Sequence, residues 1–196
     1  MATPVKQKLI VYQGSTFSEI IRWETPKKIY KPISDISSTA PAIVTSTAHG
    51  IPNGWRVKLG NIAGMKELNS TSIYHNIIVI STDTFELNDI NAVGYTPYTT
   101  GGIVEYYEPK NLTGYTARLQ IRPKLDSTEI LLELTTENAG IVIDNVDKTI
   151  SLYISAINTA IIDWTSGVYS LELVSSTGVV ETILNGDVVV KREVTR

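Results

Sequence analysis

Short runs in which apolar and polar residues alternate recur along the whole chain. The clearest is YTARLQIRP, at residues 115–123. Successive side chains of an extended strand point to opposite faces, so this run predicts a half-buried strand with one solvated side. Its apolar side consists of Tyr115, Ala117, Leu119 and Ile121, and its polar side of Thr116, Arg118, Gln120 and Arg122. Similar runs are KLIVYQG, TFSEIIRW, EILLELTT, GIVIDNVDKTISLYIS and GVYSLELVSSTGVVETILNGDVVVKREV. The chain is therefore predicted to be all-β.

Turn-forming residues separate these runs. We expect turns at residues 145–148, at residues 176–178 and at Asn185-Gly186. Both residues of an Asn-Gly pair accept the positive φ of a type I′ turn, so the last site predicts a hairpin.

One segment, residues 155–164, departs from the β pattern. Ile157, Ala160 and Ile161 have helical spacing there, and Ser155 stands at the N-cap position. We expect a helix of one or two turns that crosses between two sheets.

The middle of the chain differs from its flanks. Residues 38–104 are rich in Thr, Asn and Gly, and they hold closely spaced short strands: IVTSTA, WRVKLG, HNIIVIST, TFELND and GGIVEYY. Such spacing is typical of a small barrel or meander. Neither flank resembles a flexible linker, so we expect residues 38–104 to be an inserted module hosted by one domain of residues 1–37 and 105–196.

Composition narrows the function classes. The net charge is −3 with no basic cluster, so we expect no nucleic-acid partner. Cysteine is absent, which excludes disulfides, thiol catalysis and cysteine-bound metal and fits folding in a reducing cytoplasm. No apolar run approaches the roughly 20 residues of a membrane-spanning helix, and the first residues lack the apolar core of a signal peptide, so no membrane partner is expected.

The stretch TAHGIPNGWR (47–56) is the strongest candidate for catalysis. His49 could act as a base and Arg56 as an anion clamp, or the stretch could be a turn followed by a strand. A catalytic histidine needs a group that orients it and a nucleophile within reach. His49 and the second histidine, His75, lack such a pattern, so we favour the turn.

A pair of carboxylates offers a weaker candidate. Asp83 and Glu86 could serve a glycoside hydrolase, but residues three apart in a strand point to opposite faces. Asp and Asn beside a short strand, Asp89 included, are more often turn residues. We therefore predict that the protein is not an enzyme, with no catalytic, cofactor-binding or metal-binding residues and no cofactor.

Aromatic residues leave one alternative open. Trp55, Tyr95 and Tyr98 could stack on sugar rings, which would make the middle segment a carbohydrate- or receptor-binding module. The adjacent Tyr106 and Tyr107 could likewise form a platform or simply fill a core. An exposed aromatic row would support sugar binding, and burial of Trp55 would weaken it.

The flanking sequence resembles a known family. The stretches VYQGSTFSEIIRWE, NLTGYTARLQIRP, GIVIDNVDKTISLYISAINTAIIDWTSGVYSLELV and ILNGDVVVKREVTR are similar to immunoglobulin-like domains of tailed-phage structural proteins, such as the N-terminal domain of baseplate upper proteins. The resemblance spans most of residues 9–37 and 105–196. It implies a discontinuous immunoglobulin-like β-sandwich.

The middle segment resembles a second family. AHGIPNGWRVKLGNIAGMKELNS, TFELND and YTTGG are similar to the small β-barrel of the first catalytic-cysteine half-domain of ubiquitin-activating enzymes, a module that phage virion proteins also carry. That half-domain does not supply the nucleophile, and this chain has no cysteine, so no ubiquitin chemistry is implied.

Together the resemblances imply a non-enzymatic structural protein of a tailed-phage virion, made in the bacterial host cytoplasm. It would sit in a tail, baseplate or neck ring or decorate the head, as a symmetric homo-oligomer whose partners are other virion proteins. The middle segment would act as a spacer or recognition knob. The expected interface residues are Met1, Lys6, Lys8, Asn53, Tyr95, Tyr98, Lys191, Arg192 and Arg196. The alternative is that these residues form a frayed terminus, a charge-protected edge strand and ordinary polar loops.

The sandwich should close only after the middle segment is complete, because its first strand would pair with the later ones. Tyr169 is expected to act as a corner tyrosine, with its hydroxyl bonded to backbone near the start of its own strand. The expected core consists of Leu119, Ile121, Leu132, Ile143, Ile150, Leu152, Leu171, Leu173 and Val189.

Overall fold

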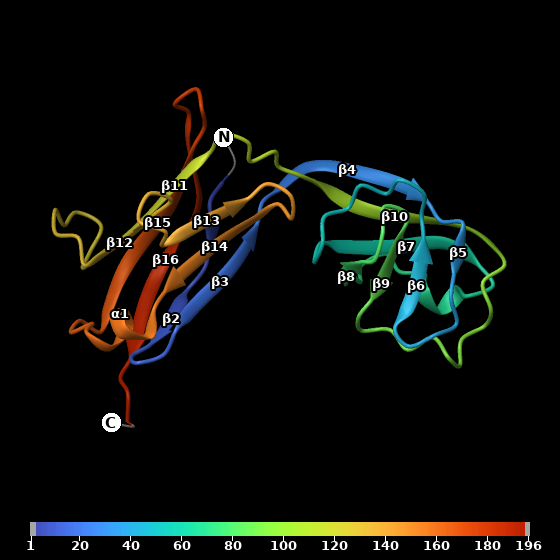
Figure 1. Cartoon of the computed structure of the whole chain (residues 1–196), viewed down its shortest axis with the longest axis horizontal. Coiled ribbons are helices and arrows are strands. Elements are labelled where there is room, and N and C mark those ends of the chain that lie inside the picture. Colours follow the sequence, from blue (N-terminus) through green and yellow to red (C-terminus); the bar gives the residue numbers. More distant parts are fainter. Residues whose placement is uncertain (1–2, 195–196) are drawn as a thin grey trace. The chain divides into compact units, whose positions relative to one another are not determined.

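The computed structural model describes residues 3–194, and nearly all of its regular structure is β-strand, as predicted (Figure 1). The chain divides into two compact units. One, which we call the sandwich unit, is made of the residues up to Trp23 and from Asn111 onward; the other, the inserted unit, spans Glu24–Lys110. Within residues 3–194, no helix is long and apolar enough to cross a membrane.

The inserted unit is larger than the expected 38–104. Strand β4 (Glu24–Pro32) pairs antiparallel with β10 (Thr100–Pro109), and Tyr30 lies opposite Glu105. This pairing moves the unit boundaries to 23/24 and 110/111. Residues 24–32 gave little strand signal because lysines and prolines interrupt the alternation in ETPKKIYKP.

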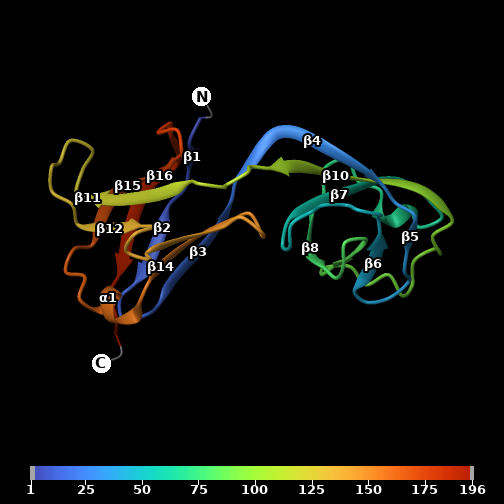
Figure 2. The ribbon, with the colours of Figure 1, turned by 45° about the horizontal axis from the view of Figure 1, so that its top comes forward.

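The inserted unit consists of one seven-stranded sheet that curls into a half-barrel (Figure 2). The strand order is β4-β10-β7-β8-β9-β6-β5. The further strands are β5 (Asp35–Ile36), β6 (Ala42–Thr45), β7 (Arg56–Ala63), β8 (His75–Val79) and β9 (Thr84–Leu87), with a short 3-10 helix at Lys66–Leu68. The curled sheet surrounds a core that includes Trp55, Leu59, Met65, Ile77 and Phe85.

The sandwich unit packs two sheets around a separate core and is an immunoglobulin-like sandwich (Figures 1 and 2). The larger sheet runs β1-β16-β15-β11-β12, with β2 also paired to β16. Its strands are β1 (Val5–Lys6), β2 (Leu9–Tyr12), β11 (Thr116–Arg122), β12 (Leu132–Thr135), β15 (Ser166–Val174) and β16 (Val180–Lys191). The smaller sheet contains β13 (Ile141–Asp144), β14 (Thr149–Ile154) and β3 (Phe17–Arg22).

The first strands of the chain close the sandwich by pairing with its last ones, as expected. Strands β1 and β2 run parallel to β16, while β3 runs antiparallel to β14. Each sheet of the sandwich therefore contains chain from both sides of the inserted unit.

Most of the predicted core is correct. Leu119, Ile121, Ile150, Leu152, Leu171 and Leu173 are buried, and Leu132 and Ile143 pack against them partly buried. Val189 is the exception: its neighbours Val188 and Val190 face the core instead. Three consecutive valines do not reveal which of them face inward. The register shift of β16 opposite Leu171 and Glu172 determines which side chains of β16 face the core.

The predicted helix is α1 (Ala156–Ala160), which links β14 of the smaller sheet to β15 of the larger one. The Ser155 hydroxyl caps it by accepting a hydrogen bond from the Asn158 N–H at 3.2 Å. The side chain that it buries is Thr159, which donates from Oγ1 to the Ser15 carbonyl at 2.8 Å.

Two of the three predicted turns are confirmed, at residues 145–148 and 176–178. The hairpin expected at Asn185-Gly186 is wrong, because β16 runs straight through both residues. Gly186 lies opposite Tyr169, and the Gln7 carbonyl occupies the space that a side chain at position 186 would need. The absence of a side chain at Gly186 therefore allows two backbone segments to approach each other closely.

Tyr169 does bond to backbone, but not near the start of its own strand. Its hydroxyl donates to the Gln7 carbonyl at 3.0 Å. Burial, together with the nearby negative charge of Glu19, raises the pKa of Tyr169 to about 12. This contact joins the segment between β1 and β2 to β15.

We expect Gly186→Ala to destabilise the sandwich unit by about 1–3 kcal/mol, because the new methyl group overlaps the Gln7 carbonyl. Urea denaturation, followed by the NMR signals of the unit that carries each substitution, measures this. Gly94→Ala is the control: its methyl group meets open space, and we expect a change within about 0.5 kcal/mol. Equal stability of the two variants would contradict the close approach.

Tyr169→Phe should remove a specific pH dependence. The folded-state pKa, about 12, lies above the unfolded value of about 10, so Tyr169 contributes stability below pH ~10 that is lost as the pH rises toward 12. At neutral pH the variant should lose about 1 kcal/mol for the hydrogen bond to Gln7. Unfolding free energies at neutral and strongly alkaline pH, with the exposed Tyr153→Phe as control, test this. A difference between wild type and Tyr169→Phe that stays constant with pH would refute it.

Candidate binding surface

His49 is buried in the inserted unit, with both ring nitrogens engaged. Nδ1 accepts a hydrogen bond from the Ile51 N–H at 3.0 Å, and Nε2 lies 3.1 Å from the Ser81 carbonyl. Nε2 therefore carries the proton of a neutral ring. The ring also packs edge-on against Phe85. The structure thus places His49 at a turn, as favoured from the sequence.

The other titratable candidates also have local partners. His75 Nδ1 lies 3.0 and 3.1 Å from the two oxygens of Asp89, and Asp83 Oδ1 accepts from the Ala48 N–H at 2.7 Å. Asp83 thus holds a turn, while Glu86 lies within β9. Across residues 3–194, no group of three or more His, Asp or Glu side chains is arranged to hold a metal ion.

The aromatic row considered for sugar binding is not a surface row. Trp55 is fully buried and donates from Nε1 to the Tyr107 carbonyl at 3.0 Å. The Tyr98 hydroxyl donates to the carbonyls of Ile33 and Gly101, and Tyr95 packs half-buried on the core. These three rings hold the half-barrel together, so the alternative loses the residues on which it was based.

The expected interface residues fall in both units. Lys6, Lys8, Lys191 and Arg192 are exposed in the sandwich unit, and Arg192 donates to the Asp163 carbonyl. Asn53 is exposed in the inserted unit, where its Oδ1 accepts from the Val79 N–H at 3.1 Å. Met1 and Arg196 lie outside the described residues.

The outer face of β4, β10 and β7 carries a cluster of rings and cations. Tyr74 and Tyr107 stack with their centroids 6.4 Å apart. Arg56 and Lys58 lie 5.0 and 5.8 Å from the Tyr74 ring, and Lys28 lies 5.5 Å from the Tyr107 ring. The expected anion clamp, Arg56, is bound by Glu24 through two hydrogen bonds of 2.7 and 2.5 Å, and this hydrogen bonding raises the pKa of Arg56.

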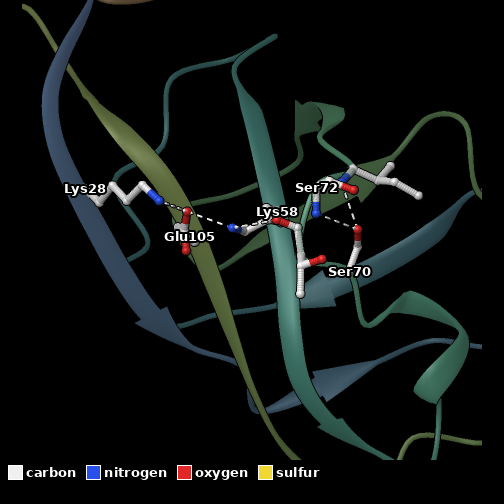
Figure 3. Close-up of polar contacts among 7 residues, drawn as sticks. Lys28, Lys58, Ser70, Ser72 and Glu105 are labelled. Atoms are coloured by element: carbon white, nitrogen blue, oxygen red, sulfur yellow. Dashed lines mark hydrogen bonds and ion pairs between the residues drawn. The ribbon is translucent and has the colours of Figure 1, made fainter.

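Glu105 lies between two lysines on this face. Lys28 on β4 and Lys58 on β7 reach its Oε1 from the two sides of β10, at 2.7 and 2.9 Å (Figure 3). Burial alone would raise the pKa of Glu105, but the hydrogen bonds and positive charges of both lysines outweigh burial and lower it. The hydrogen bond to Glu105 in turn raises the pKa of Lys28. Glu105 and Lys28 are therefore charged at neutral pH.

A shallow depression of about 220 Å³ lies beside this ion pair network. Its floor includes Gly60, where a side chain would meet only open space. A turn at one wall is fixed by Ser70, whose Oγ accepts from the N–H groups of Ser72 and Ile73 at 3.1 and 2.7 Å (Figure 3). We call this feature the Gly60 depression; its lining includes Tyr30, Lys58, Gly60, Asn61, Ser70, Ile103 and Glu105.

A second surface lies in the sandwich unit. Ile157 and Ile161, four residues apart at α1, are 78% and 77% exposed. Ile161 also lines a groove of about 320 Å³ together with Ile130, Leu131 and Trp164. We call these five residues the α1 patch.

Sequence reasoning missed both surfaces. The Gly60 depression requires the pairing of β4 with β10, and strand alternation does not reveal which strands become neighbours. Ile157 and Ile161 have helical spacing, which does not show whether the face that they form is buried or exposed. The hydrogen bond of Thr159 turns that face outward.

Part of the inserted unit matches a known family. Residues 40–107 match the family described as the ubiquitin-activating enzyme E1 FCCH domain. Residues 40–107 form an E1 FCCH domain. The half-barrel sheet is the structure of this domain, and β4 and β5 add two strands that precede the matched range. No curated protein matches the chain.

The burial pattern separates structural rings from surface rings. We expect Trp55→Ala to cost about 3–5 kcal/mol in the inserted unit, because a fully buried indole and its hydrogen bond are lost. Tyr30→Ala should change stability by less than about 0.5 kcal/mol, since the Tyr30 ring is exposed. Denaturation followed by NMR signals of the inserted unit measures both. Similar costs for the two variants would contradict the burial assigned here.

Proposed function

We propose that this protein is a non-enzymatic structural component of a tailed-bacteriophage virion and that it acts by protein–protein assembly. Two resemblances support the proposal: that of the flanking sequence to immunoglobulin-like virion domains, and that of the inserted unit to a module that phage proteins carry. The observation that carries it is the α1 patch, where two neighbouring isoleucines are more than three-quarters exposed.

The exposure of this patch is built into the fold. Thr159 buries its hydroxyl against the Ser15 carbonyl, which fixes the rotation of α1 and turns Ile157 and Ile161 to solvent. Residues four apart on a helix lie side by side, so the two side chains form one continuous surface. Burying an isoleucine stabilises a complex by about 1.5–3 kcal/mol, and contiguous exposed apolar patches mark interaction sites.

The partner is another virion protein or a further copy of this chain in a symmetric ring. The ring would belong to the tail, baseplate or neck, or the protein would decorate the head. Contacts between unlike surfaces close into rings when the rotation between copies permits it. Repetition around the ring would make modest affinity per contact sufficient. The inserted unit would serve as a spacer or recognition module.

The double variant Ile157→Asp/Ile161→Asp tests the proposal. It should fold as wild type, because both side chains are exposed, and it should lose saturable binding to virions that lack the protein. The measurement is co-sedimentation of purified protein with such virions.

The matched control is Ile73→Asp/Val93→Asp, which places the same two charges at exposed aliphatic positions of the inserted unit. It should retain binding at a fixed copy number. A wild-type protein that does not bind virions would refute the proposed function. Full binding by the α1 variant would refute the role of the α1 patch.

A further inference from the structure

The Gly60 depression has the size of a site for a single ring. Its volume of about 220 Å³ is below the ~300–1,000 Å³ typical of pockets for drug-sized ligands. The missing side chain at Gly60 leaves the floor open, so a ring can lie against the backbone of β7.

One wall of the depression is apolar and aromatic. Tyr30 is 57% exposed, and it stands beside Ile103 on the neighbouring strand. A phenol ring offers a flat apolar face together with a polar tip. The carbon-bound hydrogens of a sugar ring form a matching apolar face.

The rest of the lining, which begins with Glu105 directly beside Tyr30, alternates hydrogen-bond acceptors and donors. The carboxylate of Glu105, whose Oε1 both lysines approach, is an acceptor in this lining. Lys58 directs one donor to Glu105 and one to the Thr71 carbonyl, and an ammonium group has three donors. The Ser70 hydroxyl accepts two backbone N–H groups and can donate its own proton. The carboxamide of Asn61 supplies both kinds of group at the rim.

We infer that the Gly60 depression binds one pyranose ring of a glycan. The ring would lie against Tyr30 and place adjacent hydroxyls on Glu105 and Lys58. Each sugar hydroxyl both donates and accepts, so a neighbouring acceptor and donor in the wall suit a pair of adjacent hydroxyls. This inference goes beyond the proposed assembly function and uses the other unit of the chain.

The charges of the site do not balance. Glu105 offsets one of the two lysines that contact it, so the network Lys28–Glu105–Lys58 has a net positive charge. This charge does not disfavour an acidic sugar relative to a neutral one.

The site is also preorganised. The network Lys28–Glu105–Lys58 and the turn at Ser70 fix their side chains before any ligand arrives, which reduces the entropy lost on binding. Tyr30 and Lys28 lie on β4, outside the residues that match the E1 FCCH family. The other lining residues lie within the matched range, so the added strand β4 contributes Tyr30 to a depression formed mainly by residues 58–105.

NMR titration of the full chain tests the inference. The probes are the methyl glycosides of glucose, galactose, mannose and N-acetylglucosamine, with methyl glucuronide as the acidic comparison, at millimolar concentrations. We expect saturable shift changes confined to the lining of the Gly60 depression with at least one of these glycosides. Tyr30→Ala and Asn61→Ala should each abolish saturation.

Tyr153→Ala is the matched control, because it removes an exposed tyrosine from the sandwich unit and should leave the titration unchanged. The amide spectrum of each variant reports its fold. No saturable shifts with any glycoside, or unchanged saturation in the folded Tyr30→Ala variant, would each overturn the inference. None of these results bears on virion binding through the α1 patch, so the two proposals fail separately.

Discussion

The sandwich unit depends on the attachment of the N-terminal segment to the last strand of the chain. Gln7 concentrates this attachment: its N–H donates to the Asn185 carbonyl, its carbonyl accepts from the Tyr169 hydroxyl, and its side chain donates to Glu19 on the other sheet. Gly186 leaves the room that the Gln7 carbonyl needs.

Because strands from both sides of the inserted unit share each sheet, the sandwich cannot close before residue 180 onward is in place. The entropy of closing a connection grows slowly with its length, so a long insertion at this point is tolerated.

The two units carry different kinds of surface. The sandwich unit exposes an apolar patch whose orientation is fixed by the buried hydroxyl of Thr159, which suits a protein partner. The inserted unit instead presents rings, paired charges and the Gly60 depression, which suits a small polar ligand. A structural protein that assembles through one unit and recognises a glycan through the other would use both surfaces. Substitutions at one surface would remove one role and leave the other intact.

The alternation of apolar and polar residues predicted which segments form strands, but it did not predict which strands pair with one another. Residues 115–123 showed β11 and its buried face, because period two is a local property of a strand. Strand β4 was missed because its partner β10 is distant in the sequence, with Tyr30 paired to Glu105, and its own alternation is broken by lysine and proline. Asn185-Gly186 has the local signature of a turn, but contact with Gln7 overrides it. The pairing of Glu105 with Lys28 and Lys58 needs three strands in register, so no single stretch of sequence indicates it.

Native-state amide hydrogen exchange on the intact chain is the most direct test of whether the N-terminal strands close the sandwich unit. Amides of β2 and β3 should open together with those of β14 to β16, at one shared free energy, because these strands form one cooperative body. Amides of β6 to β10 should open at a free energy of their own, because they surround a separate core. Exchange of β2 and β3 at the rate of an unprotected terminus, while β14 to β16 remain protected, would contradict the closure on which the sandwich unit rests.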